Sequence, residues 1–281
     1  MPTFDTPTPI SATIDLGLGD VRITAGDRAT TVVDVRPSDP SNDEDTRAAN
    51  ATRIDLADGR LLVKAPKLRQ WLPRTDGGSV DVTVELPAGS NIDGSAGSAD
   101  FRCDGRLGAC RIKTGLGTIE VDQADGLHLK SGAGDITVDH ATGDAELTAG
   151  SGELRVRELD GGAVIKNSNG DTWVGLAAGE VRLNAANGSI AVDLAHASVG
   201  ATSAKGDVRL GEVVRGSVVL ETKIGDLEVG IREGTAAWLD VNARAGKVHN
   251  ALTAGDSPGT SGERVEVRAR TSVGNIVIRR P

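Results

Sequence analysis

The stretch between Gly134 and Val192 reads GDITV at 134–138, GELRV at 152–156, GDTWV at 170–174 and GSIAV at 188–192. Each segment begins with glycine, ends in valine, and starts 18 residues after the one before it. In each segment, residues expected to face inward, which are mainly aliphatic, alternate with residues expected to face outward. This pattern is typical of a half-buried β-strand. A fixed repeat of this length indicates a protein built from stacked, equivalent units.

The repeat continues on both sides of this stretch. The same segment recurs at Gly117, Gly206 and Gly225, and successive glycines along the whole run lie 17 to 19 residues apart. Two further apolar positions precede most of these glycines by seven and five residues, as Leu127 and Leu129 do for Gly134. Each repeat therefore predicts two short strands that meet at a glycine bend, where a positive φ costs little.

One such coil cannot bury its own apolar side, but coils stacked about 4.8 Å apart pair every strand with those above and below it. The interior then consists of columns of equivalent side chains. One predicted column contains Ile119, Ile136, Leu154, Thr172, Ile190, Val208 and Leu227. The sequence therefore predicts an all-β fold, a single-stranded β-solenoid (β-helix) with coils of about 18 residues.

The repeat is less regular at both ends of the chain. Residues 99–103 fit it with alanine in place of glycine, and residues 19–23 (GDVRI) fit it near the N-terminus. Near the C-terminus, Gly246 and Gly274 continue it with spacings of 21 and 28 residues.

The pattern stops between Arg36 and Pro87, which we interpret as a capping segment. Residues 41–44 (SNDE) fit a capping box and predict one short helix at about 41–51. Strands are expected around Arg60–Ala65 and Val80–Leu86. We predict two regions: 1–98, with the N-terminal coil and the capping segment, and 99–281, with the regular solenoid and its irregular C-terminal coils.

Composition excludes several classes of protein. The 281 residues include 37 Gly, no Tyr, two Phe and three Trp, which fits a thin core of Val, Ile, Leu and Ala. The net charge of −9 disfavours nucleic acid as a partner, because phosphate binding requires a concentrated basic face. The sequence shows no signal peptide and no long apolar run, so a cytoplasmic location is expected and membrane contact is not.

Candidate chemical sites are few. Cys103 and Cys110 have no third or fourth metal-ligating partner nearby, so we predict no metal site and no cofactor. We interpret both cysteines as small core residues. The Gly132-Ala133-Gly134 segment lacks the lysine of a nucleotide loop and predicts a tight corner. The equivalent outward positions of Lys113, Lys130 and Lys166 predict a solvated face.

One segment stands out as a candidate partner contact. Residues 64–74 are basic and amphipathic in an acidic protein, and the residues we single out are Lys67, Arg69, Trp71 and Arg74. The alternative is a loop that packs Leu68, Trp71 and Leu72 against the side of the solenoid. Trp173 is expected to face outward.

The chain also resembles a known family. The features that carry the resemblance are Gly19-Asp20-Val21-Arg22-Ile23, the segment VDVTVELP at 80–87, and the recurring Gly-Asp-Ile-x-Val coils. They are similar to the bacterial DUF4097 or "putative adhesin" β-strand-repeat family, and the resemblance covers nearly the whole chain. It implies a β-solenoid fold and no established activity.

These observations together predict a non-enzymatic structural scaffold or protein-interaction module, with no catalytic residues. A protein partner is expected, and a homo-oligomer is a further option. One alternative is a self-polymerising rod like the bactofilins, which the capping segment opposes. Another is an adhesin-like protein that binds a surface or a carbohydrate.

Overall fold

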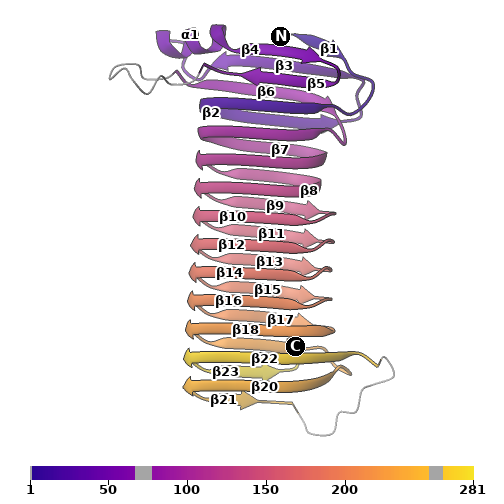
Figure 1. The fold of residues 1–281 in the computed structure, drawn as a ribbon, viewed down its shortest axis with the longest axis vertical. Coiled ribbons are helices and arrows are strands. Elements are labelled where there is room, and N and C mark those ends of the chain that lie inside the picture. The colour runs from indigo at the N-terminus through magenta and orange to yellow at the C-terminus, as the bar shows by residue number, and fades with distance from the viewer. Residues whose placement is uncertain (1, 67–77, 253–261) are drawn as a thin grey trace. The chain divides into compact units, whose positions relative to one another are not determined.

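The computed structural model describes residues 2–66, 78–252 and 262–281. Contacts between residues divide the chain into two units, Met1–Thr142 and Gly143–Pro281, hereafter unit 1 and unit 2. Each unit is built from parallel strands that wind as a β-solenoid, which confirms the predicted fold class (Figure 1). The predicted boundary between residues 98 and 99 stays a prediction. No helix within the described ranges has the length and apolar character to cross a membrane.

Unit 1 holds nine strands and one helix among its described residues. They are β1 (Thr3–Asp5), β2 (Ser11–Gly26), β3 (Thr30–Pro37), α1 (Asp43–Ala51), β4 (Arg53–Ala57), β5 (Arg60–Lys64), β6 (Val80–Pro87), β7 (Asn91–Leu116), β8 (Ile119–Ala133) and β9 (Ile136–Ala141). The helix and the strands β5 and β6 lie where the sequence predicts them.

Unit 2 holds the remaining strands, in pairs that correspond to the repeats. They are β10 (Ala145–Ser151), β11 (Leu154–Leu159), β12 (Ala163–Asn169), β13 (Thr172–Ala177), β14 (Val181–Asn187), β15 (Ile190–Ala195), β16 (Val199–Lys205), β17 (Val208–Val213), β18 (Gly216–Ile224), β19 (Leu227–Ile231), β20 (Ala236–Ala245), β21 (Val248–Asn250), β22 (Arg264–Val273) and β23 (Ile276–Arg279).

The predicted columns of side chains exist inside each unit. In unit 2, parallel pairing places Leu154 beside Thr172, then Ile190, Val208 and Leu227, and all five are buried. In unit 1, the equivalent column runs through Phe101, Ile119 and Ile136. Burial of aliphatic side chains contributes about 1.5–3 kcal/mol each, so these columns are the main source of stability.

The coils do not all stack in chain order. In unit 2, β22 pairs with β18 on one side and β20 on the other, while β23 lies between β19 and β21. The last coil of the chain is therefore inserted inside the stack. In unit 1, β2 likewise pairs with β7 on one side and with β5 and β6 on the other. The first and last coils thus form hydrogen bonds on both edges.

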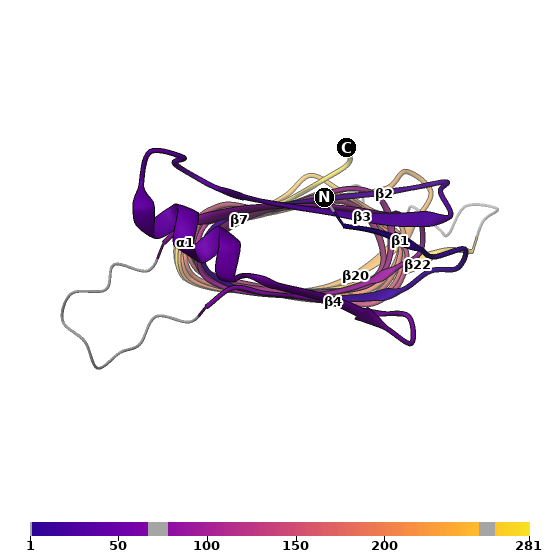
Figure 2. The ribbon, with the colours of Figure 1, turned by 90° about the horizontal axis from the view of Figure 1, so that it is seen from above.

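Antiparallel strands and the helix close one end of unit 1. Strand β3 pairs antiparallel with β6, β1 with β3, and β4 with β5. The helix packs against β3 and β6, and Figure 2 shows it at one side of the strands. The buried carboxylate of Asp45 fixes the helix, because it accepts the backbone N–H groups of Asp39 and Ser79.

The helix cap differs in detail from the predicted capping box. Asn42, not Ser41, is the N-cap residue, and its side-chain oxygen accepts the Glu44 N–H at 2.8 Å. Ser41 instead donates its N–H and hydroxyl to the carboxylate of Asp39, and these two bonds lower the pKa of Asp39.

The glycine that starts each repeat is required by geometry. Gly188 has φ +136°, and a Cβ there would lie 2.1 Å from the carbonyl oxygen of Gly170 in the preceding coil. The Gly188 N–H donates to the Lys205 carbonyl in the following coil at 2.9 Å. The glycines thus let the backbones of successive coils come into direct contact at the bend.

A buried polar column satisfies the carbonyl groups of these glycines. Three residues before the glycine, the side chain donates to the carbonyl of the preceding coil's glycine: Asn167 to Gly152, Ser203 to Gly188, Thr222 to Gly206 and Thr271 to Gly225, over 3.0 to 3.3 Å. All four donors are buried. An unsatisfied buried carbonyl costs about 1–3 kcal/mol, which explains polar residues at an interior position.

The replacement Gly188→Ala tests this geometry. We expect it to lower the free energy of unfolding by about 2–4 kcal/mol, because the new Cβ meets a backbone carbonyl and the φ is strained. Gly200→Ala is the matched control, since its nearest heavy atom beyond the chain neighbours would lie 3.9 Å away. Urea denaturation of both variants is the measurement. Equal stabilities of the two variants would contradict the assigned role of the bend.

Candidate functional site

The acidic residue after the repeat glycine has a structural role in most coils that carry aspartate there. In unit 2, Asp171 accepts the Ser189 N–H at 2.7 Å and Asp207 accepts the Asp226 N–H at 2.8 Å. In unit 1, Asp100, which follows Ala99 at the equivalent position, accepts the Thr118 N–H at 2.7 Å. Each carboxylate therefore joins its coil to the next one. The sequence analysis missed this role, although the recurrent Gly-Asp pair was its signal.

Asp20 is an exception to this pattern. It follows Gly19, pairs in register with Asp100 on β7, and its side chain is exposed. No hydrogen bond or ion pair involves its side chain among the residues that the structure describes. The carboxylate is therefore available to an outside group, unlike that of Asp100.

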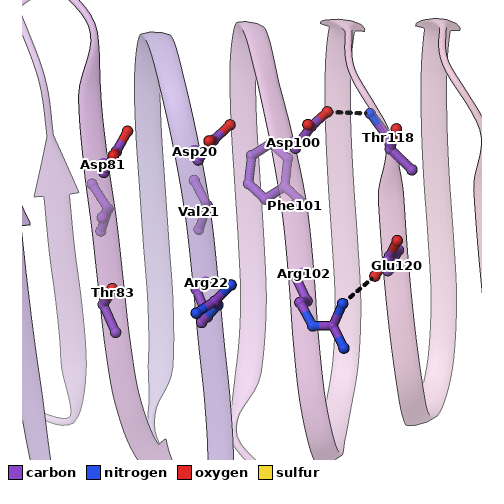
Figure 3. Close-up of a pocket in the computed structure, with 11 residues that line it drawn as sticks. Asp20, Val21, Arg22, Asp81, Thr83, Asp100, Phe101, Arg102, Thr118 and Glu120 are labelled. Carbon is purple, nitrogen blue, oxygen red and sulfur yellow. Dashed lines mark hydrogen bonds and ion pairs between the residues drawn. The ribbon is translucent and has the colours of Figure 1, made fainter. Parts of the chain in front are cut away.

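Asp20 lies in a shallow hollow of about 420 Å³ on the outer face of unit 1, formed by β6, β2, β7 and β8 (Figure 3). The strands are spaced about 4.8 Å apart, so their outward side chains form two rows across the sheet. The first row contains Asp81, Asp20, Asp100 and Thr118; the second contains Thr83, Arg22, Arg102 and Glu120. We call this surface the Asp20 face.

Arg22 is the second open charge on the Asp20 face. Its neighbour Arg102 is neutralised by Glu120 at 2.8 Å and Asp104 at 3.2 Å. On the other side, Arg22 is opposite Thr83, which carries no charge. Within the described part of the chain, Arg22 has no ion-pair partner, and it stands directly beside another arginine. An exposed guanidinium without an acidic partner can bind an added carboxylate through charge-assisted hydrogen bonds.

Asp20 and Arg22 are also not paired with each other. Charges two residues apart along the chain do form ion pairs at other places, as Arg155 does with Glu153 and Arg182 with Glu180, both at 2.8 Å. Figure 3 shows the Asp20 and Arg22 side chains at different heights on β2 without a contact. The Asp20 face therefore presents one free anion and one free cation.

A second hollow, of about 550 Å³, lies on the other sheet of unit 1. Strand pairing places Arg60 beside Ser11 and Arg111 beside His128, and all four line this hollow. It has a basic character, in contrast to the Asp20 face.

The predicted partner contact of Lys67, Arg69, Trp71 and Arg74 lies outside the described residues and stays a prediction. The predicted lysine positions are placed: Lys113 is opposite Lys130 in unit 1, and Lys166 is opposite Thr148 in unit 2. Lys166 forms an ion pair with Glu146 at 3.8 Å.

Trp173 lies on the outward register of β13, opposite Ala191, as expected. Its indole N–H donates to Asp193 at 3.1 Å. The side chain is thereby held against the sheet by a residue of its own unit.

The two cysteines are buried and free, which agrees with their interpretation as core residues. A hydrogen bond with Cys110, together with burial, raises the pKa of the Cys103 thiol well above its usual range. Because the thiolate is the reactive form, this environment disfavours a nucleophilic cysteine.

A sequence profile identifies the family of this chain. The profile of the family described as Toastrack DUF4097 matches residues 12–279. The chain belongs to this family. No curated protein matches the chain.

Several solved structures are similar to this Toastrack chain. One is a "putative adhesin" from Parabacteroides distasonis, with 13% identity, a TM-score of 0.36, and coverage of 98% of this chain and 95% of the other. A "putative lipid binding protein" from the same organism has 10% identity, a TM-score of 0.42, and coverage of 99% and 95%. A "putative cell adhesion protein" from Clostridium sporogenes has 12% identity, a TM-score of 0.28, and coverage of 100% and 98%.

The environment of the cysteines is testable by thiol chemistry. We expect Cys103 in the folded protein to resist alkylation at pH 8, and to react at the rate of a free thiol once the chain is unfolded. Because the pKa is raised in the folded state, the free energy of unfolding should fall as the pH rises above about 8.5, where the unfolded thiol loses its proton. Rapid alkylation of the folded protein would contradict the assigned burial.

Proposed function

We propose that this Toastrack protein is a non-enzymatic interaction module that binds a partner protein on the Asp20 face. The observation that carries the proposal is the open pair of charges: Asp20 and Arg22 have no partner within the described residues, while Asp100 and Arg102 beside them do. Surface ion pairs are individually weak, so such a site gains specificity and a faster encounter more than raw affinity.

The regular strand spacing supports an extended partner. The rows repeat about every 4.8 Å across four strands, and each strand presents side chains about 6.6 Å apart along the chain. A partner segment in extended conformation could carry a basic and an acidic residue two positions apart. The basic residue would lie opposite Asp20 and the acidic residue opposite Arg22. The floor of the hollow is a hydrogen-bonded sheet, so binding would require little rearrangement of the backbone.

Photo-crosslinking in cells of the native host tests the proposal. A photoreactive amino acid in place of Thr83 lies beside Arg22 and leaves both open charges intact. We expect one dominant crosslinked protein, and a reduction of about fivefold or more when Asp20→Asn and Arg22→Gln are added, since two weak charged contacts are lost.

The control carries the same amino acid in place of Thr202, which is exposed on β16 of unit 2. It should not capture the same protein. If the crosslink forms equally at Thr202, or survives the double substitution undiminished, the Asp20 face is not the binding surface.

A further inference from the structure

The coil of β20 and β21, which lies at one end of the stack in unit 2, exposes side chains that are buried in the other coils. Strand β20 pairs with β22, and within the described ranges it has no second strand neighbour. Its inward residues Leu239 and Val241 are only half-buried, whereas their partners Val267 and Ala269 on β22 are completely buried. On the companion strand β21, Val248 is 44% exposed. Among the described residues, β20 therefore has one unpaired edge, and its apolar side is incompletely covered. Figure 1 shows β20 and β21 as the last strands of the ribbon at this end of unit 2.

This edge differs from the closed end of unit 1. The outermost strands there, β1 and β4, have three and five residues, and short edge strands resist pairing with other chains. Strand β20 has ten residues and a regular register with β22 over Ala236–Ala243. It also carries Trp238, whose side chain is 56% exposed and is the most exposed tryptophan among the described residues.

The hydrogen-bonding groups of this edge can be assigned to residues. The N–H of Ala236 donates to Glu263, towards β22, and backbone groups alternate along a parallel strand. The N–H and C=O groups of Leu239, Val241 and Ala243 therefore point away from β22. They form a ladder of free donors and acceptors that another strand could complete.

We propose that a second copy of this chain completes the edge, through antiparallel pairing of β20 with the β20 of the partner about a two-fold axis at Val241. A two-fold axis perpendicular to the sheet makes the two β20 strands antiparallel and makes the stacks of the two subunits run in opposite directions. It leaves the apolar, interior faces of the two joined sheets on the same side. In this register, Val241 is opposite Val241 of the partner subunit, and Leu239 is opposite Ala243 of the partner subunit. Apolar side chains thus meet apolar side chains across the new edge.

The outward side chains of β20 are also complementary in this register. Trp238 is opposite Arg244 of the partner subunit, which forms two cation–π contacts per dimer. Asp240 is opposite Asn242 of the partner subunit and keeps its ion pair with Arg270 at 3.4 Å. A shift of the axis by one residue to Asp240 would bring two carboxylates together, which is unfavourable. The side chains of β20 are therefore compatible with those of a second β20 in antiparallel orientation.

The proposed β20–β20 contact is closed, so it produces a dimer and no larger assembly. An isologous contact uses the same surface on both subunits and leaves no second copy of that surface free. The strands β1 and β4 at the closed end of unit 1 offer short, antiparallel edges instead. We therefore expect two subunits and no filament.

Sedimentation equilibrium of the full chain from micromolar to millimolar concentration tests the proposal. The mass should rise from 28.8 kDa to about twice that value. Val241→Pro removes an N–H that points to the free edge, so it should abolish the dimer without breaking a bond to β22. Val241→Thr keeps the N–H and the branched shape, and is the matched control that still dimerises.

A second variant does not depend on the tolerance of the strand for proline. Arg244→Glu replaces an exposed side chain and should weaken the dimer by about 5- to 30-fold through loss of two cation–π contacts. A wild-type protein that stays monomeric over the whole range overturns the proposal. So does a dimer that tolerates both Val241→Pro and Arg244→Glu, or an assembly larger than two subunits. None of these outcomes bears on the Asp20 face, which lies in unit 1.

Discussion

The structure of both units depends on the direct contact between the backbones of successive coils at the repeat glycine. The carbonyl of one glycine lies where a side chain of the next would be, as with Gly170 against Gly188. Hydrogen bonds between the strands set the vertical spacing of the coils, and the absence of a side chain at the bend allows the backbones to keep that spacing there. The aliphatic columns can pack only if the spacing is kept. The buried Ser, Thr and Asn column and the outward Asp bonds are responses to the same constraint, since each supplies a partner to a backbone group at the bend.

That constraint also separates structural polar residues from functional ones. Asp171 and Asp207 are exposed acids that a surface survey would count as candidates, but they bind the backbone of the next coil. Asp20 occupies the equivalent position without this bond, and Arg22 beside it lacks an acidic partner within the described residues. The distinction depends on hydrogen bonds between coils, and it is the basis for placing the candidate site on the Asp20 face.

The sequence predicted the parts of the fold that repeat and missed the parts that depend on stacking order. The spacing of Gly134, Gly152, Gly170 and Gly188 was sufficient for the solenoid, because equal spacing along the chain implies equal positions in each coil. The insertion of β22 and β23 between earlier coils was not predictable, because Gly274 follows Gly246 in the sequence but contacts Gly225 in the structure. The unpaired charges of Asp20 and Arg22 were not predictable either. A GDVRI segment has the same sequence whether or not its aspartate accepts a hydrogen bond from the next coil.

The central claim is tested most directly by amide hydrogen exchange on protein labelled with ¹⁵N-glycine. The N–H groups of Gly170, Gly188 and Gly206 each donate to the following coil at 2.9 Å, whereas Gly234 lies in a turn with no atom near its missing side chain. The account predicts strong and similar protection for the three repeat glycines and rapid exchange for Gly234. Repeat glycines that exchange as fast as Gly234 would show that the coils do not stack through these bends.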